Sequence, residues 1–221
     1  MAQVTRTNAP PVRVADDPME SVSNWFQQNS KPLMYGVGAI VVAGASILMY
    51  RSTTASTREK ASSALYAAQT PLSQGDLAAA ATELEKVSTR FSSTASGQQA
   101  ALVLAQVLYE QKKYDEGIKA LEKARGSASA DFTSSIESMI ATGYEFQGKH
   151  ELAAGQYEKA ANAAKFPSEK GAYQASQARS LMSAGKAAEA RTVWEVLAQD
   201  ESQPYYQEAN VRLGELAAAG K

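Results

Sequence analysis

The feature that most constrains the fold of this chain is a segment of about 36 residues that recurs four times after residue 60. The recurring turn positions are Gly75, Lys112, Gly148 and Gly185, which are 37, 36 and 37 residues apart. Such a period is typical of stacked helical units, each of which buries its apolar face against the next. Alanine, the strongest helix former, is very abundant, and β-branched runs are nearly confined to residues 33–50. The sequence therefore predicts an all-α fold.

Residue size repeats at fixed distances from each turn. Seven residues before the turns stand four alanines, Ala68, Ala105, Ala141 and Ala178. Five residues after them stand four small residues, Ala80, Gly117, Ala153 and Ala190. Nine residues after them stand four large residues, Leu84, Leu121, Tyr157 and Trp194. Two antiparallel helices approach closely where both carry small side chains, and the large residue then fills the space toward the next pair.

This pattern resembles the tetratricopeptide (TPR) repeat, and the resemblance covers residues 61–204. It implies a TPR-like α-solenoid of four helix pairs, at 61–97, 98–133, 134–170 and 171–204. Residues 205–221 then form a helix that caps the last pair, as solenoids require. Pro71 should kink or shorten the first helix, because proline lacks the backbone N–H that the helix needs.

A second feature, the uncharged stretch from Pro32 to Tyr50, predicts a membrane helix. Leu33 to Tyr50 is 18 residues. As a helix it spans about 27 Å, close to the ~30 Å hydrocarbon core of a bilayer. The stretch is apolar on all sides, which argues against the core helix of a soluble domain. Its length and flanks favour an uncleaved anchor, while Ala43-Gly44-Ala45 keeps a cleavable signal peptide open.

The apolar stretch and the repeats divide the chain. Residues 1–24 are expected to be a disordered tail, 25–52 an interfacial segment followed by the transmembrane helix, and 53–60 a linker. Within the span, four small residues share one helix face and form a candidate contact face for another membrane helix. They are Gly36, Ala39, Ala43 and Ser46. The basic flanks are nearly balanced, so charge alone does not orient the span.

No residue pattern indicates catalysis. Cysteine is absent and His150 is the single histidine, so thiol chemistry, a serine–histidine triad and a multi-histidine metal site lack their residues. A net charge of −1 gives no electrostatic basis for nucleic-acid binding. Acidic pairs such as Glu83 with Glu85 lie beside lysines, as on a solvated helix face. We expect a non-enzymatic scaffold that has protein partners and no cofactor, metal or small-molecule substrate.

The candidate binding surface is the face that the first helices of the repeats share. In a TPR array this face forms the groove that holds a partner. The residues expected to line it are Leu65, Gln69, Leu102, Gln106, Tyr109, Thr142, Glu145, Arg179 and Met182. They form a mixed apolar and amide surface without the lysine and asparagine clamp of TPR modules that grip a C-terminal carboxylate.

The layout of the whole chain resembles one bacterial family, the YfgM-like ancillary subunits of the Sec translocon. The resemblance rests on Trp25, Asn29 and Lys31 before the span, Arg51 after it, and the string Ala61-Ser62-x-Ala64-Leu65-Tyr66 that opens the repeats. It implies a single-pass inner-membrane protein with a cytoplasmic N-terminus and a periplasmic TPR-like domain, whose partners are translocon subunits and periplasmic chaperones. The alternative is an accessory subunit of another inner-membrane complex.

Overall fold

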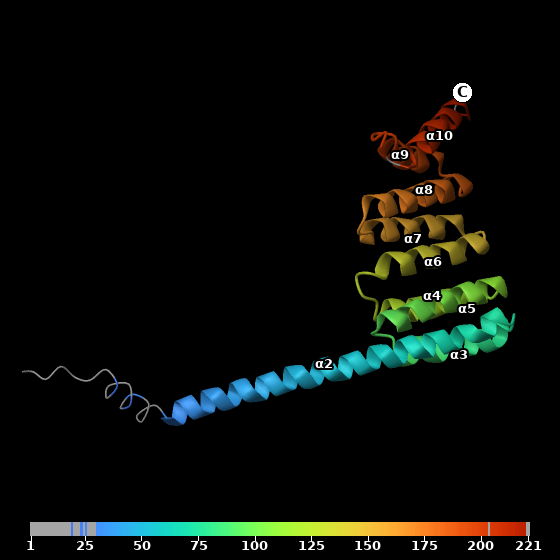
Figure 1. Cartoon of the computed structure of the whole chain (residues 1–221). Coiled ribbons are helices and arrows are strands. Elements are labelled where there is room, and N and C mark those ends of the chain that lie inside the picture. The colour runs from blue at the N-terminus through green and yellow to red at the C-terminus, as the bar shows by residue number, and fades with distance from the viewer. Residues whose placement is uncertain (1–18, 20–22, 24, 26–29, 203, 220–221) are drawn as a thin grey trace, which may run out of the picture. The chain divides into compact units, whose positions relative to one another are not determined.

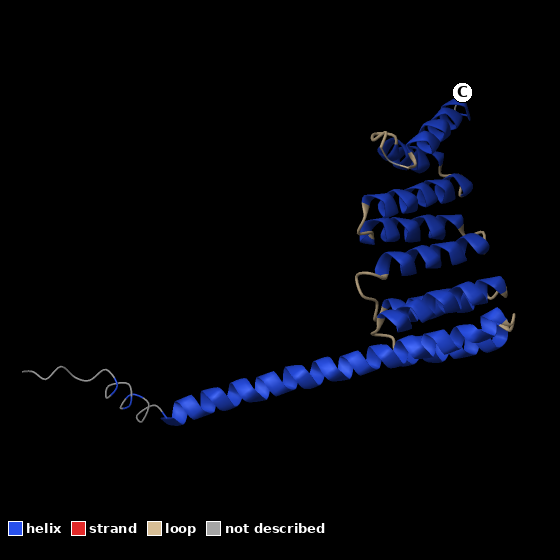
Figure 2. Cartoon of the chain, viewed as in Figure 1, coloured by secondary structure: helices blue, strands red, loops and turns tan. Residues whose placement is uncertain are grey.

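The computed structural model describes residues 19, 23, 25, 30–202 and 204–219, and every regular element in these ranges is a helix (Figure 1, Figure 2). The all-α prediction is confirmed. Apart from residues 19 and 23, the predicted tail at 1–24 lies outside the described residues. The chain divides into two compact units, residues 1–53 and 54–221.

The first described helix, α2, runs from Ser30 to Ser73 and therefore includes residues from both units. The predicted linker at 53–60 is helical and continuous with the rest of α2, and the boundary between the two units falls at its start. Residues 53–60 contain neither glycine nor proline, so nothing in this stretch breaks the helix. The Thr53 hydroxyl also donates to the carbonyls of Met49 and Tyr50, at 3.0 Å each, which satisfies this polar group within the helix.

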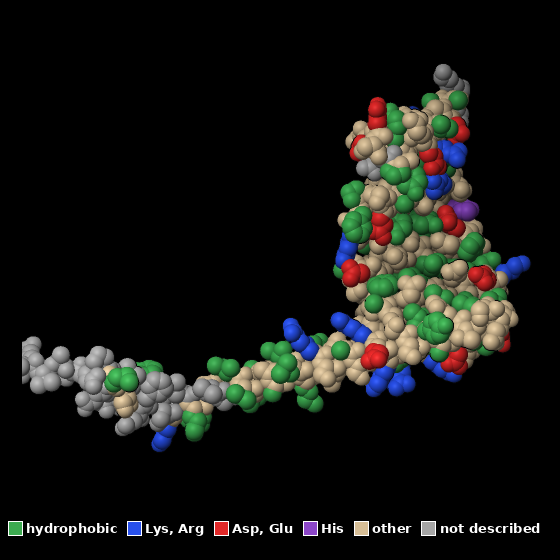
Figure 3. All heavy atoms as spheres, in the orientation of Figure 1, with side chains coloured by type: hydrophobic (Ala, Val, Ile, Leu, Met, Phe, Trp, Pro, Cys, Tyr) green, Lys and Arg blue, Asp and Glu red, His purple; other side chains and the backbone are tan. Residues whose placement is uncertain are grey.

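The apolar part of α2 is exposed around the helix. Large side chains from Met34 to Tyr50 are at least half accessible, including Ile40 at 73% and Leu48 at 69% (Figure 3). The helix is long and apolar enough to cross a membrane, and none of its most apolar window is buried against other parts of the protein. The core helix of a soluble domain would bury most side chains of this kind.

The second unit consists of helix pairs. The first helices are the end of α2, α4 (Ala95–Glu110), α6 (Thr133–Phe146) and α8 (Pro167–Ser183). The second helices are α3 (Leu77–Arg90), α5 (Tyr114–Arg125), α7 (His150–Ala163) and α9 (Ala187–Leu197). Consecutive helices pack on one another from α3 to α9, and α10 (Tyr206–Ala219) packs on α9 (Figure 1). The predicted boundaries between repeats at 97/98 and 170/171 fall inside α4 and α8. The sequence marks the turns by a recurring residue, whereas it marks the starts of the helices less clearly.

The repeated positions form the core. The four alanines before the turns are all buried, at 2% exposure or less. The large residues nine positions after the turns are buried as well, with Leu84, Leu121 and Trp194 fully inaccessible and Tyr157 at 6%. The small residues five positions after the turns are buried between them. These size predictions are confirmed, and they show that each pair closes on small side chains while a large one fills the space between helices.

Each of the four turns holds its predicted residue in the left-handed backbone region. Gly75, Gly148 and Gly185 have φ of 77°, 70° and 77°, and Lys112 has φ of 60°. Every first helix ends two residues before this position. That includes α2, so the expectation that Pro71 kinks or shortens its helix is wrong as to length. Pro71 lies in the last turn, where its missing N–H removes a single helical hydrogen bond.

Replacing Lys112 by glycine should stabilise the second repeat. A residue with a Cβ in the left-handed region is strained by about 1–2 kcal/mol, and glycine relieves that strain at some loss of chain entropy. We expect Lys112→Gly to raise the free energy of unfolding by about 0.5–1 kcal/mol, measured by urea unfolding of the full chain in detergent. Gly148→Lys, the reverse change at the next turn, should lower it. An unchanged or lower midpoint for Lys112→Gly would mean that the turn is not strained.

Candidate functional site

The predicted first-helix face is largely occupied by contacts within the protein. Leu65 and Leu102 are half-buried, and each packs against a hydrophobic cluster that includes residues of its own repeat and of the next one. Gln69 is also half-buried, whereas Gln106 is exposed. In the N-terminal half of the repeat unit, Gln106 is therefore the predicted groove residue whose side chain is most available to a partner.

Tyr109 is a core residue, which corrects its assignment to the groove. It is 6% exposed, and its hydroxyl donates to the Met139 carbonyl at 3.0 Å. A Cβ added at Gly117 or at Gly143 would lie 2.4 Å from the Tyr109 side chain, so both glycines make room for the ring. Phe146 meets the ring edge-on, with ring centroids 5.7 Å apart. Tyr109 therefore joins the second and third repeats and is not free to hold a partner.

In the C-terminal half, the structure links Thr142 and Glu145 into one polar network. The Tyr157 hydroxyl donates to Glu145 Oε2 at 2.9 Å, and the Ser180 hydroxyl donates to Glu145 Oε1 at 2.7 Å. Thr142 Oγ1 lies 3.3 Å from the Tyr157 hydroxyl. Burial raises the pKa of Tyr157 to about 12, so the phenol stays protonated and remains a donor at neutral pH. Both oxygens of the half-buried Glu145 carboxylate thus accept from hydroxyl groups.

Arg179 and Met182 are engaged as well. Arg179 donates from Nε and Nη2 to the two carboxylate oxygens of Glu208, at 2.8 and 2.6 Å, and its guanidinium lies 5.9 Å from the Tyr205 ring centroid. Met182 Sδ accepts a hydrogen bond of 3.4 Å from the Trp194 indole. A bidentate pair of this kind fixes geometry more firmly than a single contact. Arg179 therefore ties α8 to the capping helix α10.

The docking of α10 should weaken in acid. Hydrogen bonds from Arg179 hold the pKa of Glu208 below its ordinary value. A depressed folded pKa contributes stability above the unfolded pKa, near 4.3, and that contribution is lost as pH falls through the folded pKa. We expect amide protection in α10, corrected for intrinsic exchange, to be constant from about pH 7 to 5 and to fall below about pH 4. Glu208→Gln should remove this pH dependence; a persistent drop would assign it to another group.

Sequence reasoning missed Gln98, the most fully satisfied buried polar side chain in the repeats. It is 2% exposed, and its Nε2 donates to the carbonyls of Ser92 and Ser127 at 3.2 Å each. Its Oε1 accepts from the backbone N–H and the hydroxyl of Ser129, at 3.1 and 2.9 Å. Gln98 thereby joins two loops that lie one repeat apart. Nothing in the sequence distinguishes it from the exposed Gln99 beside it.

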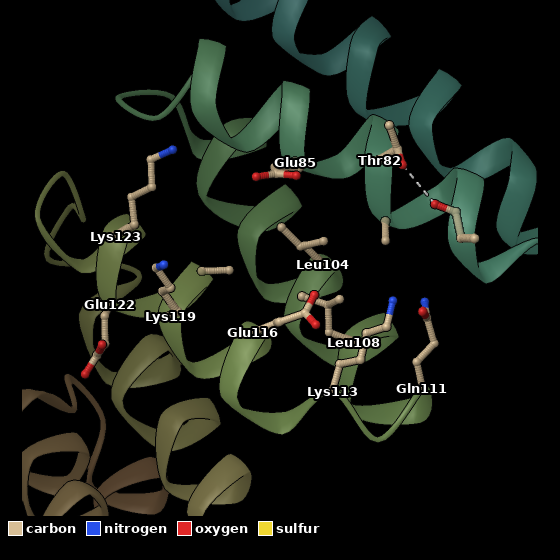
Figure 4. A pocket seen from close by; sticks show the side chains of 13 residues that line it. Thr82, Glu85, Leu104, Leu108, Gln111, Lys113, Glu116, Lys119, Glu122 and Lys123 are labelled. Atoms are coloured by element: carbon tan, nitrogen blue, oxygen red, sulfur yellow. Dashed lines mark hydrogen bonds between the residues drawn. The ribbon is translucent and has the colours of Figure 1, made fainter.

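A cleft of about 760 Å³ lies between α3 and α5, and none of the predicted groove residues lines it. Leu104 and Leu108 of α4 lie between Glu85 on α3 and the charged side chains of α5 (Figure 4). Alanines complete the apolar lining, and Lys113, Glu116, Lys119, Glu122 and Lys123 line the α5 side. This volume lies in the range of ligand sites, which combine an apolar lining with a few polar groups.

A second cleft of about 440 Å³ lies between α7 and α9, over α8. Five of its lining residues are identical to those at the equivalent positions of the first cleft, 73 residues earlier. The pairs are Ala81 and Ala154, Glu85 and Glu158, Leu108 and Leu181, Lys113 and Lys186, and Glu116 and Glu189. In the second cleft Lys186 contacts Glu151 at 2.6 Å and Glu189 at 3.3 Å, so its cation is engaged within the protein.

The four small residues of the apolar helix, Gly36, Ala39, Ala43 and Ser46, are exposed. The Ser46 hydroxyl donates to the Val42 carbonyl at 2.8 Å, so its donor is satisfied inside the helix. A Cβ added at Gly36 would meet no atom within 4 Å. That this face contacts another membrane helix stays a prediction.

Across the described parts of the chain, no group of three or more histidine, cysteine, aspartate or glutamate side chains is placed to hold a metal ion. His150 is half-buried at the start of α7. The carboxylates Glu83 and Glu151 pair with lysines, as on a solvated helix face. The described surface also carries apolar clefts with charged rims.

Comparison with known proteins agrees with this geometry. Two solved structures, the nearly identical TPR-like repeats of a kinesin light chain candidate from Podosopora anserina and a single-residue variant of them, are similar to 74% of this chain, each with a TM-score of 0.55. The identities are 18% and 19%, and 88% and 87% of those chains are covered, so the likeness shows the fold alone. No curated protein matches the chain.

The family comparison identifies the repeats by sequence. The tetratricopeptide repeat-like domain family matches residues 63–174, which is 112 of 221 residues. TPR-like folds are typically non-catalytic scaffolds for protein–protein interaction. The match extends from the end of α2 to the first half of α8, and so includes the first cleft and three of the four repeated turns. This chain belongs to the tetratricopeptide repeat-like domain family.

Proposed function

We propose that this protein is a membrane-anchored, non-enzymatic scaffold that holds protein partners on its TPR-like repeats. The observation that carries the proposal is the exposure of large apolar side chains around α2 between Met34 and Tyr50. In water such a helix would leave many apolar groups solvated, whereas a bilayer accommodates them on every side. Further along the same helix, Ala61 and Ala68 are buried in the repeat core, so the anchor and the first repeat share one helix.

The proposed location is the bacterial inner membrane, with the N-terminus in the cytoplasm and the repeats in the periplasm. The proposed partners are translocon subunits and periplasmic chaperones, which would link protein export to folding. Support for this assignment comes from the resemblance of Trp25, Asn29, Lys31 and the Ala61–Tyr66 string to the YfgM-like family. The second candidate is a fixed subunit of another inner-membrane complex, which the same anchor and repeats would serve equally well.

Intact-mass measurement of the protein from native membranes tests the anchor. Retention of residues 30–50 and resistance to extraction by alkaline carbonate are the expected results. A mass that lacks everything before Ser46 would place a cleavage at Ala43-Gly44-Ala45 and overturn the anchor. The cysteine-free sequence makes a topology test direct, because a single cysteine introduced at exposed Lys170 should react with a membrane-impermeant maleimide added from the periplasmic side.

Extraction in mild detergent, followed by quantitative mass spectrometry, separates the two candidate functions. Sub-stoichiometric recovery of Sec subunits and chaperones is expected if the scaffold makes transient contacts. Recovery of an unrelated membrane complex at fixed stoichiometry would favour the second candidate. The matched control is the same chain with its repeats intact and Ile40 and Leu48 replaced by lysine. This variant should leave the membrane fraction if the apolar helix is the anchor.

A further inference from the structure

Several charged side chains at the rim of the cleft between α3 and α5 form no ion pair with other described residues. In residues 30–202 and 204–219, no ion pair engages Glu85, Lys113 or Lys119. Lys123 donates to the Thr89 hydroxyl at 3.2 Å and has no carboxylate partner in these ranges. All three lysines are exposed; Lys113 immediately precedes α5, and the other two lie on it. Basic side chains near a helix C-terminus complement the helix dipole, but Lys119 lies before the last turn of α5, so the dipole does not account for it.

The same groove becomes more basic toward the ends of α3 and α5. A neighbouring hollow of about 610 Å³ shares Thr82, Glu85 and Lys123 with the cleft and adds Arg90 and Lys86, of which Lys86 pairs with Glu83 at 2.7 Å. A third hollow, of about 140 Å³, is lined by Lys123 and by hydroxyl groups of Ser88, Thr89, Ser92 and Ser127. An apolar floor is thus continuous with a region of cations and hydroxyl donors. Carboxylates are the groups that such donors recognise in proteins.

We propose that this cleft binds a segment of a partner protein in which large apolar side chains precede a cluster of carboxylates. The apolar side chains would cover Leu104 and Leu108, and the carboxylates would meet Lys119 and Lys123. The proposal rests on the scaffold function and names the chemistry of one partner. It places the contact between the second helices α3 and α5, over two leucines of α4 that are not among the groove residues that the sequence predicts.

The equivalent clefts support this selectivity. The cleft between α7 and α9 has the same leucine and alanine positions, but its lysine is paired and the position of Lys119 is Thr192. Between α5 and α7 the equivalent positions carry larger apolar residues, with Ile118 in place of Ala81 and Tyr144 in place of Leu108. Ile118 is buried there. An open apolar floor and unpaired lysines therefore coincide in the first cleft. Glu85, Glu116 and Glu122 also line it, but the adjoining hollow adds Arg90 beside Lys123, which favours carboxylates of a partner at that end.

The test uses the full chain in detergent and a fluorescein-labelled peptide in which leucines precede a run of glutamates. Fluorescence anisotropy should show saturable binding that weakens as salt is raised, because the carboxylate contacts are screened. Lys119→Glu combined with Lys123→Glu should weaken binding about tenfold or more, since like charges then face each other. Ala78→Trp, at an exposed position of the lining, should block the apolar floor and also weaken binding.

Two controls make the result decisive. Lys159→Glu combined with Lys170→Glu changes the net charge equally, at exposed sites outside the cleft, and should leave the affinity within about twofold. A peptide with lysines in place of glutamates should not bind. The proposal is wrong if the acidic peptide does not bind, if both charge reversals weaken it equally, or if Arg179→Glu alone removes binding. None of these outcomes affects recovery of partners from membranes, so the scaffold function would survive them.

Discussion

Replacing Tyr109 by alanine should lower the free energy of unfolding by about 3–5 kcal/mol, the range found when a large aromatic core residue is truncated. The ring fills the space that Gly117 and Gly143 leave, and a cavity would remain because both sites lack a side chain. The loss should appear as a lower urea midpoint, with the second and third repeats separating first, since Tyr109 touches both.

Two variants control this experiment. Tyr109→Phe removes only the hydrogen bond to the Met139 carbonyl and should lower the stability by about 1 kcal/mol. Gln106→Ala, one turn earlier on the exposed face of α4, should change it by less than about 0.5 kcal/mol. If Tyr109→Ala kept full stability and lost partner binding, the groove assignment from the sequence would be right and the core assignment wrong.

Replacing Gln98 by leucine should lower the free energy of unfolding by about 2–4 kcal/mol, because it leaves the Ser129 N–H and the Ser92 and Ser127 carbonyls without their partner. Leucine has nearly the size of glutamine, so the effect comes from hydrogen bonds rather than from a cavity. A buried polar group that loses its partner costs about 1–3 kcal/mol. Urea unfolding of the full chain in detergent measures the change.

The neighbouring glutamine provides a matched control. Gln99→Leu makes the same chemical change at an exposed position and should be neutral within about 0.5 kcal/mol. Hydrogen exchange adds a local readout, because the amide of Ser129 should lose protection in Gln98→Leu but not in Gln99→Leu. Equal stability of the two variants would show that the four hydrogen bonds of Gln98 add nothing to the fold.

These expectations follow from contacts that make the repeats unequal. Gln98 connects the first and second repeats through the Ser92 carbonyl, Tyr109 connects the second and third, and Glu145 the third and fourth, each with a different side-chain chemistry. The stability of a solenoid is approximately a sum of repeat and neighbour terms. A substitution at one of these joints should therefore loosen one pair of repeats and leave distant repeats folded.

The sequence by itself determined the helical class, the period and the residues that close each pair. Turn residues such as Gly148 and core residues such as Ala141 and Trp194 recur at fixed distances along the chain, and local spacing fixes where they lie on a helix. The apolar helix was equally visible, because length and hydropathy are local properties. The family match and the burial of these positions confirm the repeat pattern.

Only the tertiary structure decided which polar and aromatic residues are available to a partner. Gln98 and Gln99 are the same residue type, yet only Gln98 is buried, where it donates a hydrogen bond to a loop 29 residues further along the chain. Tyr109 fits a groove pattern, but Gly143 in the next repeat admits its ring into the core. The cleft between α3 and α5 likewise combines helices that lie one repeat apart. Such contacts depend on how neighbouring repeats pack against each other, and the spacing of residues along a single helix does not determine that packing.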